Sequence, residues 1–102
     1  MKIINEGNFE RETGSGLVLV DFFATWCGPC QRLGPVLEDL QGDFLGKAKF
    51  FKLDIDESRA LARKFSVMSV PTMILLKDGR PVDRMVGYMP PEDIKRQLEM
   101  HL

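Results

Sequence analysis

The feature that most constrains this fold is a seven-residue apolar run, Leu17–Phe23, in which Asp21 is the one polar residue. Successive side chains of a strand point to opposite faces of a sheet, and here both sets are apolar. Such a strand is typical of the centre of a sheet that is covered on both faces. The run therefore predicts a central strand at residues 17–23 that is covered on both sides, and the β-α-β pattern of the whole chain then predicts an α/β fold.

The two cysteines of the chain, Cys27 and Cys30, follow directly after this run in the motif Trp-Cys-Gly-Pro-Cys. Residues three apart on a helical turn lie about 5–6 Å apart at Cβ, so a disulfide can open and close there without large backbone movement. The free N–H groups and the dipole at a helix N-terminus favour a thiolate. The motif therefore predicts a redox-active pair, with Cys27 exposed and more acidic and Cys30 more shielded.

A structural disulfide and half of a zinc site are alternative interpretations of the pair. A structural zinc ion needs about four ligands. Beyond the cysteines the chain offers His101, which we expect to lie in a frayed C-terminus. We therefore expect no metal and no cofactor in one chain. A metal or iron–sulfur centre shared by two chains, and a binding module with incidental cysteines, remain open.

The remaining pattern predicts one domain, residues 1–102, with a mixed sheet and helices on both faces. The helix after the cysteines has apolar residues at i, i+3, i+4 and i+7, and Pro35 should kink it. The expected strands are at 2–4, 17–23, 48–55, 72–76 and 81–86. Four helices are expected: a short one capped by Asn8, one from Pro29 to about Gly42, one at 57–65 capped by Asp56, and a last one from about Pro91.

Charge excludes several classes of partner. Fourteen basic and fifteen acidic residues give a net charge of −1, and no run of one sign marks a nucleic-acid or membrane surface. No stretch approaches the ~20 apolar residues of a membrane span, and the first residues have no apolar signal segment. We expect a cytoplasmic monomer whose partners are proteins or small thiols.

Asp21 is the second informative residue. An ionised carboxylate inside a buried strand costs several kcal/mol unless it is paired, so the pKa of Asp21 should rise. A carboxyl of this kind can carry a proton during catalysis. The alternative is a structural ion pair with Lys52, which would lie on the adjacent strand if residues 48–55 pair with residues 17–23.

Residues 18–30, followed by Val-Pro-Thr at 70–72 and Lys-Asp-Gly at 77–79, closely resemble the thioredoxin family. The resemblance extends from about Lys2 to the C-terminus. It implies a thioredoxin fold with residues 17–23 as the middle strand. It also implies a general protein disulfide reductase in which Cys27 attacks, Cys30 resolves, and a thioredoxin reductase supplies electrons.

The same resemblance implies roles for residues outside the cysteine pair. It matches Asp21 to a buried acid that helps to deprotonate Cys30, with Lys52 beside it. It makes Pro71 a cis-proline, although X-Pro bonds in folded proteins are cis in only about 5–6% of cases. The implied substrate-binding residues are Trp26, Gly28, Pro29, Val70, Pro71 and Gly87.

The sequence also departs from the family pattern. Phe23 stands where tryptophan is frequent, and Gln31 stands where lysine is common, which removes one positive charge beside the helix start. Methionines fill irregular gaps in cores. We therefore favour a core role for Met73, and favour apolar filling over groove lining for Met68 and Met89.

Overall fold

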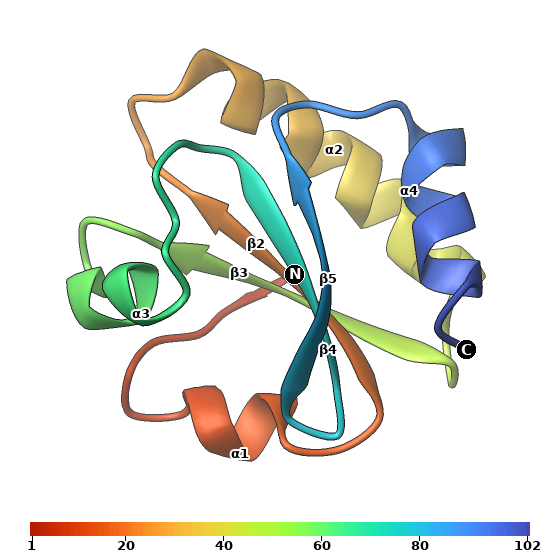
Figure 1. Cartoon of the computed structure of the whole chain (residues 1–102). Coiled ribbons are helices and arrows are strands. Elements are labelled where there is room, and N and C mark those ends of the chain that lie inside the picture. The colour runs from red at the N-terminus through yellow and green to blue at the C-terminus, as the bar shows by residue number, and fades with distance from the viewer.

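The central strand is β2, Leu17–Phe23, as predicted. The computed structural model describes all 102 residues and places β2 in the middle of a five-stranded mixed sheet of order β1-β3-β2-β4-β5 (Figure 1). Strand β2 pairs in parallel with β3 and antiparallel with β4. In chain order the elements are β1 Lys2–Ile3, α1 Phe9–Thr13, β2, α2 Gly28–Asp43, β3 Ala48–Asp54, α3 Arg59–Lys64, β4 Thr72–Lys77, β5 Arg80–Val86 and α4 Pro91–Glu99.

Helices cover both faces of the sheet, which explains why β2 is apolar on both sides. Leu17 and Leu19 pack in one core with residues of α2 and α4. Val18, Val20 and Phe22 pack in a second core with residues of α1 and α3. Burying one such side chain contributes about 1.5–3 kcal/mol, so the two cores hold β2 in place from both sides.

Helix α2 presents its apolar stripe to the sheet, as its sequence spacing predicted. Leu33, Leu37 and Leu40 are buried on that face. The helix runs from Gly28 to Asp43 with Pro35 inside it, so the chain stays helical through the proline. The predicted end near Gly42 is confirmed to within one residue, whereas the kink stays a prediction.

The predicted cap of α3 is wrong. The helix begins at Arg59 after Ser58 rather than at residue 57 after Asp56. The Asp54 carboxylate accepts a hydrogen bond from the Asp56 backbone N–H at 2.8 Å, and the Asp54 carbonyl accepts one from the Ser58 N–H at 2.9 Å. Such a turn competes with a helix at residue 57.

The Asn8 cap is also not made as expected. The Asn8 side chain accepts a hydrogen bond from the Asn5 backbone N–H at 2.8 Å and makes no side-chain bond to α1.

Strand β1 ends one residue earlier than expected, at Ile3, and the Ile4 side chain is buried in the core with an exposed fraction of 1%.

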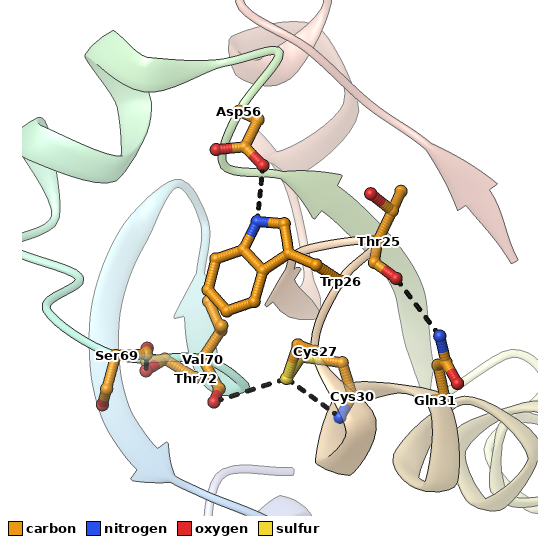
Figure 2. The surroundings of a disulfide bond; sticks show 9 residues. All are labelled: Thr25, Trp26, Cys27, Cys30, Gln31, Asp56, Ser69, Val70 and Thr72. Carbon is orange, nitrogen blue, oxygen red and sulfur yellow. Dashed lines mark hydrogen bonds between the residues drawn. A yellow bond between two sulfur atoms is a disulfide. The ribbon is translucent and has the colours of Figure 1, made fainter.

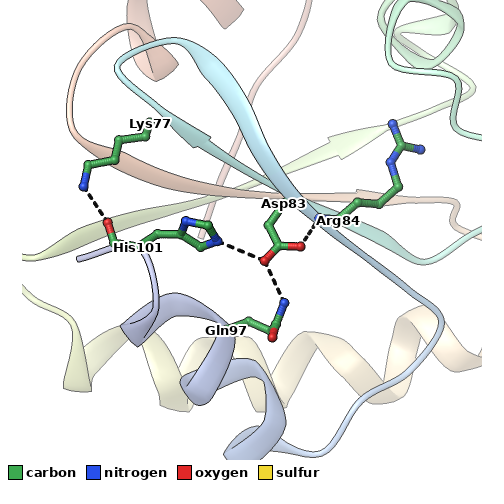
Figure 3. Close-up of polar contacts among 5 residues, drawn as sticks. All are labelled: Lys77, Asp83, Arg84, Gln97 and His101. Carbon is green, nitrogen blue, oxygen red and sulfur yellow. Dashed lines mark hydrogen bonds and ion pairs between the residues drawn. The ribbon is translucent and has the colours of Figure 1, made fainter.

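The C-terminus is docked rather than frayed. Asp83 on β5 accepts a hydrogen bond from Gln97 Nε2 at 2.7 Å, and His101 Nε2 lies 2.9 Å from the same carboxylate oxygen (Figure 3). The Lys77 ammonium donates to the His101 carbonyl at 2.7 Å. His101 is therefore held at the C-terminal end of α4 and does not join the cysteine pair as a possible metal ligand.

The topology brings distant segments to one end of β2. Because β4 runs antiparallel to β2, with Phe22 opposite Thr72, the end of β2 meets the start of β4. Residues 70–71, just before β4, therefore lie beside the turn that leads from β2 into α2.

No helix is both long enough and apolar enough to cross a membrane.

Candidate active site

Cys27 and Cys30 form a disulfide at the N-terminus of α2, with their Cα atoms 5.3 Å apart. Cys27 is the N-cap and has an extended backbone, whereas Cys30 lies in the first turn. The Cys30 backbone N–H donates to Cys27 Sγ at 3.2 Å (Figure 2). The helix start therefore directs a backbone donor at the Cys27 sulfur, where it would stabilise a thiolate.

The expected difference in exposure between the two cysteines is wrong for this disulfide form. Each retains an exposed fraction of 5%. Their surroundings differ instead, because Cys27 Sγ lies 3.6 Å from the Val70 carbonyl oxygen whereas Cys30 lines a cavity beneath the motif. Val70, which comes from the loop before β4, packs against the cluster that Ala24 and the two cysteines form.

Trp26 lies on the surface beside the disulfide and is not packed into the core. Its exposed fraction is 69%. The indole Nε1–H donates to the Asp56 carboxylate at 2.9 Å, which fixes the orientation of the ring (Figure 2). Sequence reasoning gave Asp56 a capping role and missed this contact, for which no local sequence signal exists.

The Val70–Pro71 peptide bond is cis. The family resemblance implied this, whereas the general frequency of cis X-Pro bonds favoured trans. The backbone amide of Val70 has no hydrogen-bond partner. Gly87 has a φ of +89°, a conformation that favours glycine, and its N–H donates to the Pro71 carbonyl at 2.8 Å. Thus Gly87 lies beside Pro71, Val70 lies beside Cys27, and Gly28 and Pro29 lie between the two cysteines as exposed residues.

Asp21 is buried on β2, directly opposite Lys52 on β3 in the parallel register. No ion pair joins the two side chains, and one carboxylate oxygen, Oδ1, has no hydrogen-bond partner. Burial raises the pKa of Asp21 from its ordinary value of 3.8 to about 7, and the charge of Lys52 opposes part of that rise. The predicted rise in pKa is confirmed, and the direct ion pair is absent.

A cavity of about 360 Å³ connects Asp21 with Cys30. Lys52 and Gln31 are also among its lining residues. Gln31 Nε2 donates to the Thr25 carbonyl at 3.2 Å and so ties α2 to the turn that precedes the cysteines (Figure 2). Asp21, whose pKa is raised to about 7, and Cys30 therefore line the same cavity.

The chemistry of this site is thiol–disulfide exchange. The two sulfurs are joined as a disulfide, the Cys30 backbone N–H donates to the Cys27 sulfur, and Asp21 lines the same cavity as Cys30. No three His, Cys, Asp or Glu side chains gather closely enough to hold a metal ion.

Comparison with known proteins agrees with this chemistry. The sequence model of the thioredoxin family matches residues 1–100. Thioredoxins of Staphylococcus haemolyticus and Staphylococcus saprophyticus are each 52% identical over 99 residues, which is 97% of this chain and 95% of theirs. A thioredoxin of Staphylococcus aureus is 50% identical over the same lengths. The chain belongs to the thioredoxin family and is a thiol–disulfide oxidoreductase that reduces disulfides by dithiol–disulfide exchange through Cys27 and Cys30.

Proposed function

We propose that the two cysteines have different tasks in this exchange. The Cys27 thiolate attacks a client disulfide, displaces one client sulfur as a thiol, and forms a mixed disulfide with the other. Cys30 then attacks the Cys27 sulfur, releases the second client thiol, and leaves the Cys27–Cys30 disulfide. The observation that carries this assignment is the N-cap position of Cys27, with the Cys30 N–H 3.2 Å from its sulfur.

Asp21 accepts the proton of Cys30 in the second step. A thiol must lose its proton before it attacks, and a nearby base with a pKa close to the working pH serves best. The pKa of about 7 and the cavity shared with Cys30 support this role. Lys52 acts through its charge, which limits the rise in the pKa of Asp21 and keeps part of the carboxyl ionised at neutral pH.

The client segment binds as an extended strand beside the cis-proline. The free amide of Val70 and its carbonyl are offered to the client backbone, since unpaired backbone groups next to a strand recruit extended peptides. Trp26 supplies an exposed aromatic contact on one side. Gly28, Pro29, Pro71 and Gly87 complete the surface around the disulfide.

The chain works as a single cytoplasmic domain and as a monomer, and a thioredoxin reductase returns it to the dithiol form. The named thioredoxins that it resembles over nearly their full length support the reductase partner. The net charge of −1 favours protein clients over nucleic acid or an anionic membrane.

Trapping of mixed disulfides tests the assignment of the cysteines. A Cys30→Ser variant incubated with insulin should accumulate reducible adducts through Cys27, because the resolving thiol is absent. Cys27→Ser should trap few adducts, and the double variant should trap none. Iodoacetamide should label Cys27 first in the reduced wild type. Adducts formed mainly through Cys30 would reverse the two roles.

A further inference from the structure

Met68 is the most exposed large apolar side chain of the molecule, with an exposed fraction of 91%. It is therefore neither core nor filler, contrary to our expectation. Single apolar residues on a surface are ordinary. The position of Met68 sets it apart, since it lies two residues before Val70, whose carbonyl oxygen is 3.6 Å from Cys27 Sγ. Two residues of chain span at most about 7 Å.

The loop that carries Met68 is anchored on both sides. Arg84 donates to the Ser66 carbonyl at 3.2 Å, and Thr72 Oγ1 donates to the Ser69 carbonyl at 2.7 Å. Val67 packs into the core that contains α1 and α3, and Val70 packs against the cysteine pair. Because Val67 and Val70 pack inward and both ends of the loop are hydrogen-bonded, Met68 is held at a fixed place on the rim of the active site.

We propose that Met68 is a peroxide-sensitive contact on the client-binding surface, so that its oxidation weakens reduction of protein clients. The proposal rests on the function proposed above, in which clients bind beside Val70. An unbranched, polarizable thioether adapts to apolar groups of varied shape, which suits a surface that meets different clients. Its sulfoxide is polar and chiral and makes a poorer apolar contact.

The oxidation needs hydrogen peroxide and nothing else. The thioether sulfur attacks one peroxide oxygen, the O–O bond breaks, and the second oxygen leaves as water after proton transfer. The sulfur loses two electrons and the peroxide gains them. While Cys27 and Cys30 are joined as a disulfide they have no free thiolate to react, so peroxide acts on exposed methionines first.

The chain contains its own control. Met100 is also exposed, with a fraction of 70%, but it is the C-cap of α4, and Figure 1 shows the C-terminal end of α4 at a distance from the start of α2. Met73 and Met85 are buried, with fractions of 0% and 4%. Peroxide should therefore oxidise Met68 and Met100 together and spare these two, but only the change at Met68 should affect clients.

The experiment treats the disulfide form of wild type, Met68→Leu and Met100→Leu with peroxide, removes the peroxide with catalase, and locates sulfoxides by peptide mass spectrometry. Reduction of insulin and of the small disulfide cystine is then measured with dithiothreitol as electron donor. Each variant is compared with its own untreated sample. In wild type and Met100→Leu, treatment should raise KM for insulin about fivefold, roughly the effect of losing part of one apolar contact. In Met68→Leu it should not, and cystine reduction should be unchanged in all three.

Three results would overturn the proposal. They are an unoxidised Met68, an unchanged KM for insulin despite sulfoxide at Met68, and a loss of activity that persists in Met68→Leu or extends to cystine. An untreated chain that fails to reduce insulin would refute the proposed function as well. An active chain that is insensitive to oxidation of Met68 would refute this proposal alone.

Discussion

Replacing Asp21 by asparagine should stabilise the protein at alkaline pH and slow its catalysis. Asparagine has nearly the same shape as aspartate but cannot ionise. Asp21 is buried, with an exposed fraction of 2%, and its Oδ1 has no hydrogen-bond partner. The substitution therefore removes a charge that the folded state accommodates poorly while keeping the local packing.

The pH dependence follows from the raised pKa. Burial raises the pKa of Asp21 from 3.8 to about 7, so the folded protein holds this proton more tightly than the unfolded chain does. Below about pH 4 both states are protonated and Asp21 costs nothing. As pH rises from about 4 to about 7 the unfolded chain loses the proton first, and stability falls. Above that range the full cost of about 4 kcal/mol applies, since one pKa unit corresponds to about 1.4 kcal/mol.

Urea unfolding of the disulfide form over this pH range measures the effect without thiol titration. The free energy of unfolding of Asp21→Asn should equal that of wild type near pH 4 and exceed it by up to about 4 kcal/mol near pH 8. Asp39→Asn, at an exposed position on α2, is the matched control for the removal of one carboxylate from the chain. A gain that is the same at every pH, or absent near pH 8, would refute a pKa of Asp21 near neutrality.

Catalysis should change in the opposite direction. If Asp21 accepts the proton of Cys30, Asp21→Asn should lower insulin reduction near pH 7, by up to about a hundredfold where resolution limits turnover. Higher stability together with lower turnover separates a proton acceptor from a purely structural residue. Unchanged turnover across the thiol titration range would leave Asp21 without a catalytic role.

Three further outcomes follow from the site and the core. Asp56→Ala should release the Trp26 indole and raise KM for insulin several-fold, while the free energy of unfolding measured in urea should change by about 1 kcal/mol or less. An unchanged KM would mean that the orientation of the indole does not affect client binding. Gln31→Lys should speed alkylation of reduced Cys27 by iodoacetamide at mildly acid pH, because it adds a positive charge near the helix start; an unchanged rate would contradict this. Leu33→Ala, at a fully buried position of α2, should lower the free energy of unfolding by about 2–5 kcal/mol in urea titrations, and a loss below about 1 kcal/mol would show that this core relaxes around the cavity.

The sequence predicted the elements whose signal is local and repeated. Strand β2 is apolar on both faces, and α2 repeats apolar residues at helical spacing, so both were predicted within a residue or so of their bounds. The start of α3 was mispredicted because Asp54 and Asp56 offer competing turn contacts that a simple cap pattern does not distinguish.

The sequence did not predict the contact between Trp26 and Asp56, which depends on strand register. In the parallel pair β2 and β3, Phe23 lies opposite Asp54, so the chain segments that leave both strands emerge at one edge. Trp26 and Asp56 meet there although thirty residues separate them. The burial of the two cysteines also depends on distant residues, because Ile55 and Val70, which follow β3 and precede β4, pack against the cluster that contains them.

The unpaired state of Asp21 connects the fold to its chemistry. Lys52 is its register partner, yet the Lys52 ammonium lies 5.4 Å from the centre of the Phe23 ring rather than on the carboxylate. A direct ion pair would stabilise the ionised carboxylate and draw the pKa of Asp21 down toward its ordinary range. The acid would then be a weak proton acceptor near pH 7. A fold selected for stability alone would close that pair or place an apolar side chain at residue 21. Keeping the carboxyl buried and unpaired instead lowers stability by about 4 kcal/mol at alkaline pH, and it leaves Asp21 with the raised pKa that its proposed role as a base for Cys30 requires.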